Sequence, residues 1–178
     1  MRVVAGEYRG RTLATPRGLA TRPTADRVRE ALFSILGPVE GLDVLDLFAG
    51  SGALGIEALS RGAASATFVE RDRRTAAVIR RNLEDVGAGD RARVVVSDAV
   101  AWLRARRGKE AFNLVLLDPP YDSAVRLGGP LSDHLPGVLA PEAVIVTESD
   151  KRAPLELGIP RSDERTYGDT RVAIHRAE

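Results

Sequence analysis

The stretch that decides the fold reads Asp43-Val44-Leu45-Asp46-Leu47-Phe48-Ala49-Gly50-Ser51-Gly52. Its first six residues are apolar enough to predict a buried parallel strand, which Ala49 and the following Gly-Ser-Gly end. Residues 53–61 then have apolar side chains at helical spacing, and Gly62 is a stop signal. This strand, glycine turn and helix form the opening unit of a parallel α/β sheet.

The same alternation continues along the chain. Further strands are predicted at 66–70, 93–96, 112–117 and 143–147, with helices at 73–86 and 100–106 and a Gly- and Pro-interrupted helical region at 124–139. Segments 162–167 and 171–176 flank Gly168-Asp169, a hairpin turn signal. We therefore expect an α/β fold of the Rossmann-like type: a doubly wound, mostly parallel sheet with helices on both faces and a C-terminal antiparallel hairpin.

The first 40 residues have a different pattern. Val3-Val4 and Thr12-Leu13 suggest a small hairpin, and Thr24 is a candidate N-cap for a helix with Val28, Leu32 and Ile35 on its apolar face. We expect 1–40 to be a basic extension that does not fold independently, and 41–178 to be the α/β domain.

Composition bounds the class of protein. The chain has 178 residues, 44% apolar and 29% charged, which is typical of one globular domain. It has no cysteine, and its two histidines, His134 and His175, are far apart, so we expect no metal site. No signal peptide or membrane-length apolar run is present, so the cytoplasm is the expected location.

The net charge of +1 hides an asymmetry. Residues 1–29 hold seven arginines against two acids, a net charge of +5. Such an arm predicts phosphate contacts, and we assign Arg2, Arg9, Arg11 and Arg17 to nucleic-acid binding. Arginine codon bias is the competing interpretation, since only Lys109 and Lys151 are lysines.

The predicted strand ends carry the candidate cofactor residues, because ligands bind at the carboxyl ends of parallel strands. The candidates are Asp46, Phe48, Gly50, Ser51, Gly52, Glu70, Arg71, Asp98 and Ala99. Gly50-Ser51-Gly52-Ala53-Leu54-Gly55 also matches the dinucleotide fingerprint, with Glu70 about 20 residues on, which leaves an NAD enzyme open. Asp46 fits a pyrophosphate poorly and the cationic methionyl end of S-adenosylmethionine well. Asp98 is either an adenine contact or a helix N-cap, and one side chain can be both.

The fourth strand ends in Asp118-Pro119-Pro120-Tyr121. A rigid turn would explain the prolines, but a catalytic role explains the whole string. The Asp118 carboxylate and the Pro119 carbonyl can accept hydrogen bonds from an exocyclic base amine, which frees the nitrogen lone pair. Tyr121 can stack on a base removed from its helix, and the prolines fix the placement. We predict Asp118, Pro119, Pro120 and Tyr121 as the catalytic residues.

The chain resembles the RsmD family of bacterial 16S rRNA guanine-N2 methyltransferases, which act at guanine 966. Residues 2–11, Arg22 to Glu30, Asp46 to Ser60, Val69 to Asp72 and Leu117 to Tyr121 follow the family pattern. Tyr8 departs from it, because the family usually has tryptophan there. The N-terminal strings narrow the resemblance to this family, since the glycine turn is shared by class I methyltransferases and the Pro-Pro-aromatic motif by those that methylate amines.

The resemblance implies S-adenosylmethionine as cofactor, no metal, and 16S rRNA within a small ribosomal subunit or assembly intermediate as substrate. It also implies that 41–178 is a methyltransferase domain, and we expect a monomer with no membrane partner. Three alternatives stay open: an amino-methyltransferase acting on DNA adenine or protein glutamine, an NAD-dependent oxidoreductase, and a catalytically silent RNA-binding module.

Overall fold

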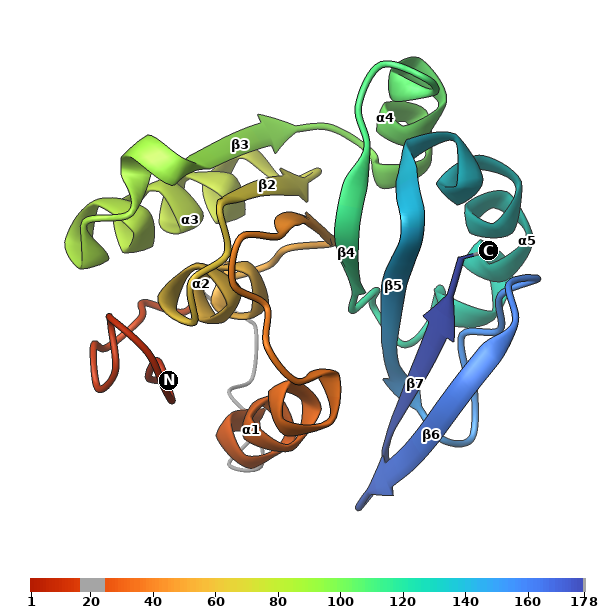
Figure 1. Cartoon of the computed structure of the whole chain (residues 1–178), viewed down its shortest axis with the longest axis horizontal. Helices are drawn as coiled ribbons and strands as arrows, with labels where there is room; N and C mark the ends of the chain where they lie inside the picture. The colour runs from red at the N-terminus through yellow and green to blue at the C-terminus, as the bar shows by residue number, and fades with distance from the viewer. Residues whose placement is uncertain (17–24, 178) are drawn as a thin grey trace.

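Seven strands form one sheet in the order β3-β2-β1-β4-β5-β7-β6 (Figure 1). We describe it from a computed structural model, in which residues 1–16 and 25–177 are described. The strands are β1 (Asp43–Leu47), β2 (Ser65–Glu70), β3 (Ala92–Val96), β4 (Phe112–Leu117), β5 (Leu139–Asp150), β6 (Arg161–Tyr167) and β7 (Thr170–Arg176). The first five pair in parallel, while β7 runs antiparallel between β5 and β6. The predicted fold class, including the terminal hairpin, is confirmed.

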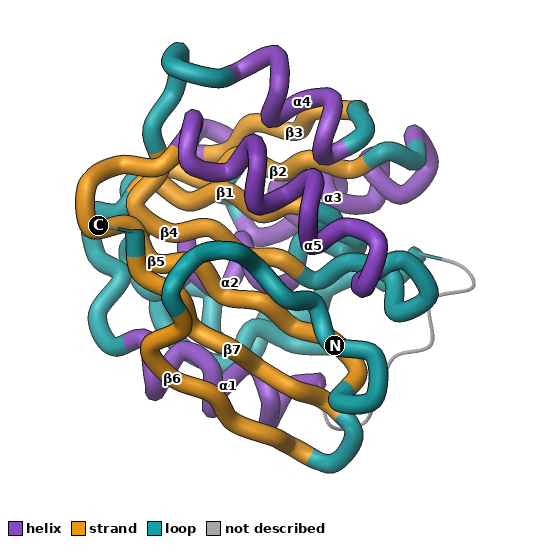
Figure 2. Tube along the Cα trace, turned by 90° about the vertical axis from the view of Figure 1, so that its right-hand side faces the viewer, coloured by secondary structure: helices purple, strands orange, loops and turns teal. Residues whose placement is uncertain are grey.

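The helices lie in two layers, one on each face of the sheet (Figure 2). They are α1 (Ala25–Leu36), α2 (Ala53–Ser60), α3 (Arg73–Val86), α4 (Ala99–Arg106) and α5 (Ala124–His134), with short 3-10 turns η1 (Gly89–Arg91) and η2 (Leu135–Val138). The core divides accordingly. On β4, Leu114 and Leu116 pack with the α1, α2 and α3 side, whereas Val115 and Leu117 pack with the α4 and α5 side. This alternation explains why the central strands are apolar on both faces.

Most element boundaries agree with the prediction to within one residue, and the differences at β1, the interrupted helical region and β5, which starts at Leu139, are informative. The first strand ends at Leu47, because the chain turns at Phe48 with a φ of 61°. The interrupted helical region divides into α5 and the 3-10 turn η2, which ends at Val138. β5 extends to Asp150, well beyond the predicted end at residue 147, and its last residue pairs with Thr170 of β7. Polar residues have little strand preference of their own, so tertiary pairing sets this end.

The N-terminal segment forms the predicted hairpin, with one antiparallel bridge between Arg2 and Thr12. Its apolar side chains Val3, Tyr8 and Leu13 are buried in the core cluster of the α2 face. We call residues 1–13 the N-terminal hairpin. The predicted cap residue Thr24 and the predicted phosphate contact Arg17 lie outside the described part of the chain.

A buried glutamate on α2 holds the N-terminal hairpin in place. The Glu57 carboxylate, fully buried, accepts hydrogen bonds from the backbone N–H groups of Val4 at 2.8 Å and Ala5 at 3.0 Å. It also pairs with Arg29 of α1 at 3.4 Å and Arg61 at 2.8 Å. Because Arg29 is itself buried and paired, it belongs to the core and not to the phosphate-binding charge of the basic arm. One carboxylate therefore joins the hairpin, α1 and α2.

Candidate active site

A cavity of about 820 Å³ opens at the carboxyl ends of the parallel strands. It lies where the strand order reverses between β1 and β4, the usual ligand position in such sheets. Twelve of the thirteen residues predicted to bind cofactor or catalyse line it: Asp46, Phe48, Gly50, Ser51, Glu70, Arg71, Asp98, Ala99, Asp118, Pro119, Pro120 and Tyr121. The sheet therefore brings four separate sequence motifs to one space.

Asp46 is the most buried acid of the cavity, at 1% exposure. Its carboxylate accepts a hydrogen bond from the backbone N–H of Gly55, in the first turn of α2, at 2.9 Å. Burial, which outweighs that hydrogen bond, raises the pKa of Asp46 to about 8, and the nearby Glu70 charge acts in the same direction. A cation bound beside Asp46 would supply the positive counter-charge that stabilises the ionised form of this buried carboxylate.

The glycine turn brings backbone close to the cavity. Phe48 and Gly50 both have positive φ, 61° and 58°, and both line the cavity. Such a conformation is costly for phenylalanine and is concentrated at functional sites. Gly52, the thirteenth predicted residue, does not line the cavity: it is the left-handed N-cap residue of α2. The last glycine of the fingerprint, Gly55, is a packing residue, since an added Cβ would lie 2.4 Å from the Phe68 ring.

Glu70 and Asp98 each have a structural bond as well as a place in the cavity wall. Glu70 accepts from the backbone N–H of Gly50 at 3.0 Å and of Asp72 at 2.9 Å, so it holds the glycine turn against β2. Asp98 caps α4 by accepting from the Ala101 N–H at 2.9 Å, which confirms its cap role. A carboxylate has about four acceptor positions, so both side chains can also accept hydrogen bonds from a ligand.

The acid-Pro-Pro-aromatic string leaves the end of β4 across from Asp46. Asp118 is exposed, Pro119 is buried, and Tyr121 is half-buried at the cavity wall. The Pro120 carbonyl accepts a hydrogen bond from the Ser123 N–H at 3.0 Å, which ties the turn to the start of α5. The string is therefore held at both ends and presents a carboxylate and an aromatic ring to the same space.

Four further residues line the cavity that the sequence patterns did not predict as site residues. Glu148 of β5, Arg126 of α5, Arg29 of α1 and Thr15 all line it. Glu148 lies in Thr-Glu-Ser-Asp, a string with no motif, beyond the predicted end of its strand. Only the register of the sheet, which pairs Leu117 of β4 with Thr147 of β5, reveals that Glu148 comes next to the Asp118 strand end.

The charges of the cavity favour a cationic ligand over a pyrophosphate. Carboxylates outnumber arginines on its wall, with Asp46, Glu70, Asp72, Asp98, Asp118 and Glu148 against Arg29, Arg71 and Arg126. The start of α2, where a dinucleotide phosphate would bind, already holds the Asp46 carboxylate. In the part of the chain that the structure describes, no cluster of three or more His, Asp or Glu side chains could hold a metal ion.

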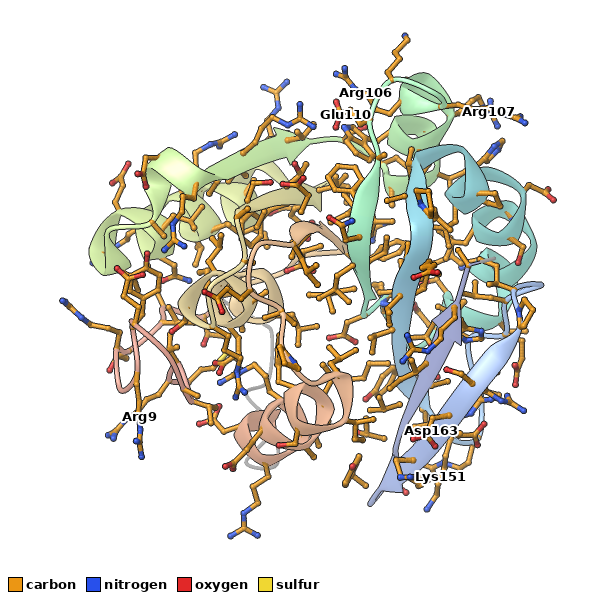
Figure 3. The ribbon with its side chains drawn as sticks, viewed as in Figure 1. Arg9, Arg106, Arg107, Glu110, Lys151 and Asp163 are labelled. Carbon is orange, nitrogen blue, oxygen red and sulfur yellow. The ribbon has the colours of Figure 1, made fainter. Side chains whose placement is uncertain are left out.

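Three of the four arginines assigned to phosphate contacts belong to the N-terminal hairpin, and Arg17 lies outside the described residues. Arg2, Arg9 and Arg11 are exposed, and no ion pair among the described residues involves them. Arg9 projects away from the body of the molecule (Figure 3). Within the same described ranges, no helix is both long and apolar enough to span a bilayer.

His175 lies in β7 and is buried, with its Nδ1 2.8 Å from the Ile159 carbonyl oxygen. It is therefore a packed histidine of the C-terminal hairpin.

Comparison with known proteins gives consistent matches. The family model described as Conserved hypothetical protein 95 matches residues 1–176. The chain is 45% identical to the ribosomal RNA small subunit methyltransferase D of Escherichia coli, over 90% of this chain and 78% of that protein. A solved hypothetical protein of Thermus thermophilus superposes with a TM-score of 0.84 at 31% identity, over 99% of both chains. An RNA methyltransferase of Salinibacter ruber in complex with S-adenosyl-L-homocysteine shares the fold, with a TM-score of 0.65 at 18% identity over 87% of this chain and 93% of that one.

Proposed function

The chain belongs to the family described as Conserved hypothetical protein 95, and from this membership and its acid-lined cavity we propose that it is an S-adenosylmethionine-dependent methyltransferase of ribosomal RNA. The family predicted from the sequence is confirmed by the relative named ribosomal RNA small subunit methyltransferase D. The product we propose is N2-methylguanine in 16S rRNA.

One observation carries the proposal: a buried carboxylate and an acid-Pro-Pro-aromatic string face one cavity from neighbouring strands. Asp46 at the end of β1 lies on the cofactor side, with Glu70 and Asp98 following along β2 and β3. Asp118 to Tyr121 lie at the end of β4, on the other side of the switch point. Donor and acceptor of the methyl group would thus meet between β1 and β4.

On the cofactor side, the residues fit the proposed ligand group by group. Asp46 would pair with the methionyl ammonium, Glu70 with the ribose hydroxyls and Asp98 with the adenine amine. Gly50 and Ser51 allow close approach of the ligand, and Phe48, Arg71 and Ala99 complete the wall. When bound, the cofactor supplies an electrophilic methyl group next to a positively charged sulfur.

On the base side, Asp118 and the Pro119 carbonyl would accept hydrogen bonds from the two N–H groups of the guanine amine. These contacts would orient the nitrogen lone pair toward the methyl group that the cofactor would supply, which the nitrogen would accept as the C–S bond breaks. The methylated nitrogen then loses a proton, which the exposed Asp118 can pass to water. Tyr121 would stack on the base, and Pro120 would keep the turn rigid.

The N-terminal extension, residues 1–40, is proposed to bind RNA through Arg2, Arg9, Arg11 and Arg17. The substrate we propose is the rRNA within a small subunit or an assembly intermediate, with the chain acting as a monomer in the cytoplasm. An assembled RNA target has a large anionic surface, so it can contact exposed arginines of this extension such as Arg9 and Arg11.

The test is methyl transfer from labelled S-adenosylmethionine to small subunits, naked 16S rRNA, duplex DNA and a glutamine-containing peptide, with the product base identified by mass spectrometry. We expect label in 16S rRNA as N2-methylguanine and none in DNA or peptide. Label in DNA or peptide alone, or in a different base, would contradict the proposal. Binding of NAD without binding of S-adenosylmethionine would instead support the NAD-dependent oxidoreductase.

A further inference from the structure

Glu148 places a second carboxylate on the base side of the cavity. It lies in β5, the strand that pairs with β4 on the side away from β2 and β3 (Figure 1). Leu117, the last residue of β4, and Thr147 of β5 are partners in parallel register, so Asp118, which directly follows β4, comes beside Glu148 of β5. Both line the cavity. Glu148 is therefore a neighbour of the proposed amine contact. In the sheet, β4 separates it from Asp46 on β1, and both β4 and β1 separate it from Glu70 on β2.

The pleat of the sheet puts Asp118 and Glu148 on the same face. Leu117, the last residue of β4, packs with the α4 and α5 cluster, so the alternation of the strand directs Asp118, just beyond it, toward the α1 and α2 side. Glu148 pairs across β7 with Val172, which belongs to the α1 and α2 cluster. Asp46 lies on this side too, against α2. All three carboxylates thus line the cavity from one face of the sheet.

Adenine, cytosine and guanine all carry an exocyclic amine, but only guanine has a ring N–H beside it. Its N1–H and its two N2–H bonds form a row of donors on the Watson–Crick edge, which enzymes read once a base is flipped out. Adenine N1 and cytosine N3 are acceptors, and an acceptor facing a carboxylate is repelled. A site with two adjacent carboxylates therefore matches guanine and rejects the other two bases.

We infer that Glu148 is the specificity-determining residue for guanine, accepting the hydrogen bond of N1–H while Asp118 and the Pro119 carbonyl accept those of N2. The inference rests on the proposed function, since it concerns the base that the site methylates. A carboxylate has acceptor positions to spare, so this bond is compatible with other contacts of the same side chain.

The test compares guanine with 2-aminopurine at the target position of otherwise identical rRNA, prepared by ligation. Both bases carry the 2-amine, but 2-aminopurine has an acceptor at N1. We expect the wild type to prefer guanine in kcat/KM by about 10- to 100-fold, the range for one hydrogen bond to a charged group. In Glu148→Gln the amide can donate to N1 of 2-aminopurine, so the preference should collapse or reverse, by about 10-fold or more.

The controls separate recognition from structure. Glu142→Gln makes the same change on an exposed residue near the other end of β5 and should keep the wild-type preference. Glu148→Asp keeps the carboxylate and should keep guanine preference even if its rate is lower. If Glu148→Gln slowed both bases equally, or if the wild type used both bases equally, the inference would be wrong. If no variant and no wild type methylated guanine at all, the proposed function itself would have failed.

Discussion

At the scale of single residues, several acids of the cavity hydrogen-bond to the protein backbone and also line the cavity. Asp46, Glu70 and Asp98 each accept a backbone N–H bond while lining the cavity. This arrangement fixes the side chains before a ligand arrives, which lowers the cost of ordering them on binding. Asp118 differs in its place, because it follows β4 on the base side of the cavity. We therefore expect the four acids to respond differently to mutation.

Asp118→Asn should reduce methyl transfer by about 100-fold or more, because it removes the acceptor that orients the amine and can take its proton. Cofactor affinity should stay within about threefold, since Asp118 lies on the base side of the cavity. Single-turnover transfer and calorimetric titration with S-adenosylmethionine measure the two quantities. An equal loss of cofactor affinity would mean that Asp118 contacts the cofactor and not the base.

Binding of the cofactor should release a proton through Asp46. In the free protein its pKa is raised to about 8, so the carboxyl is largely protonated at pH 7. A cationic ligand lowers that pKa, and the displaced proton enters the buffer. Calorimetric titration at pH 7 in two buffers of different ionisation enthalpy should show release of about one proton in the wild type and none in Asp46→Asn. A wild-type enthalpy independent of the buffer would contradict the coupling.

The same pKa has a consequence for stability. Folded, ligand-free protein retains a proton on Asp46 that the unfolded chain loses above its ordinary value of 3.8. The contribution of this group to the free energy of unfolding is therefore complete below about pH 4 and declines as the pH rises toward about 8. Asp46→Asn should remove this decline. Between about pH 6 and pH 8, the free energy of unfolding of the variant, measured in urea without ligand, should therefore rise relative to that of the wild type. Parallel pH profiles for the two proteins would refute it.

Residue types alone revealed only part of the site. Asp46, Glu70, Asp98 and Asp118 could be predicted because each lies at or just after the apolar run of a strand. Glu148 could not, because its strand continues through polar residues that only pairing with β7 makes extended. Glu57 was missed for another reason: a glutamate on a short helix is normally solvated, and its burial depends on the hairpin that packs over it.

At the scale of elements, apolar runs located the five parallel strands, because central parallel strands are buried on both faces. The Gly168-Asp169 turn signal located the polar edge strand β6 and its partner β7. Element ends were less predictable where the backbone departs from regular values, as at Phe48, or where a partner strand sets the length. The predicted N-terminal hairpin has only one bridge among the described residues, so its place in the molecule depends on contacts with α2 rather than on a strand ladder.

Glu57→Gln should loosen the N-terminal hairpin and destabilise the fold by about 3–5 kcal/mol, because the substitution leaves the buried Arg29 without its full counter-charge. Urea unfolding measures the loss, and hydrogen exchange at the Val4 and Ala5 amides measures the local opening. Glu84→Gln, an exposed position of α3, is the matched control and should change stability by less than about 0.5 kcal/mol. Unchanged stability in Glu57→Gln would mean that Asp26 alone neutralises Arg29.

At the scale of the whole molecule, the hairpin both packs and presents charge. Its apolar side belongs to the core, whereas Arg9 and Arg11 face away from it. The packing of the N-terminal hairpin is compatible both with phosphate-binding arginines and with arginines that reflect codon bias. It therefore does not decide whether the arginines bind phosphate. The far side of the molecule offers a comparison, because Arg104 and Arg107 are also exposed and lie beyond the sheet, at the end of α4, with Arg107 shown in Figure 3.

Neutralising Arg9 and Arg11 together should weaken binding to small subunits or 16S rRNA and flatten its salt dependence by about one to two units of slope, since fewer phosphate contacts release fewer counterions. Binding of wild type and Arg9→Gln/Arg11→Gln, measured at several salt concentrations, gives the slope. Arg104→Gln/Arg107→Gln removes the same charge and should leave the slope near that of the wild type. Cofactor affinity should be unchanged in both variants. If the two double variants flatten the slope equally, overall charge and not the hairpin carries the attraction, and if neither does, the hairpin arginines do not contact the RNA.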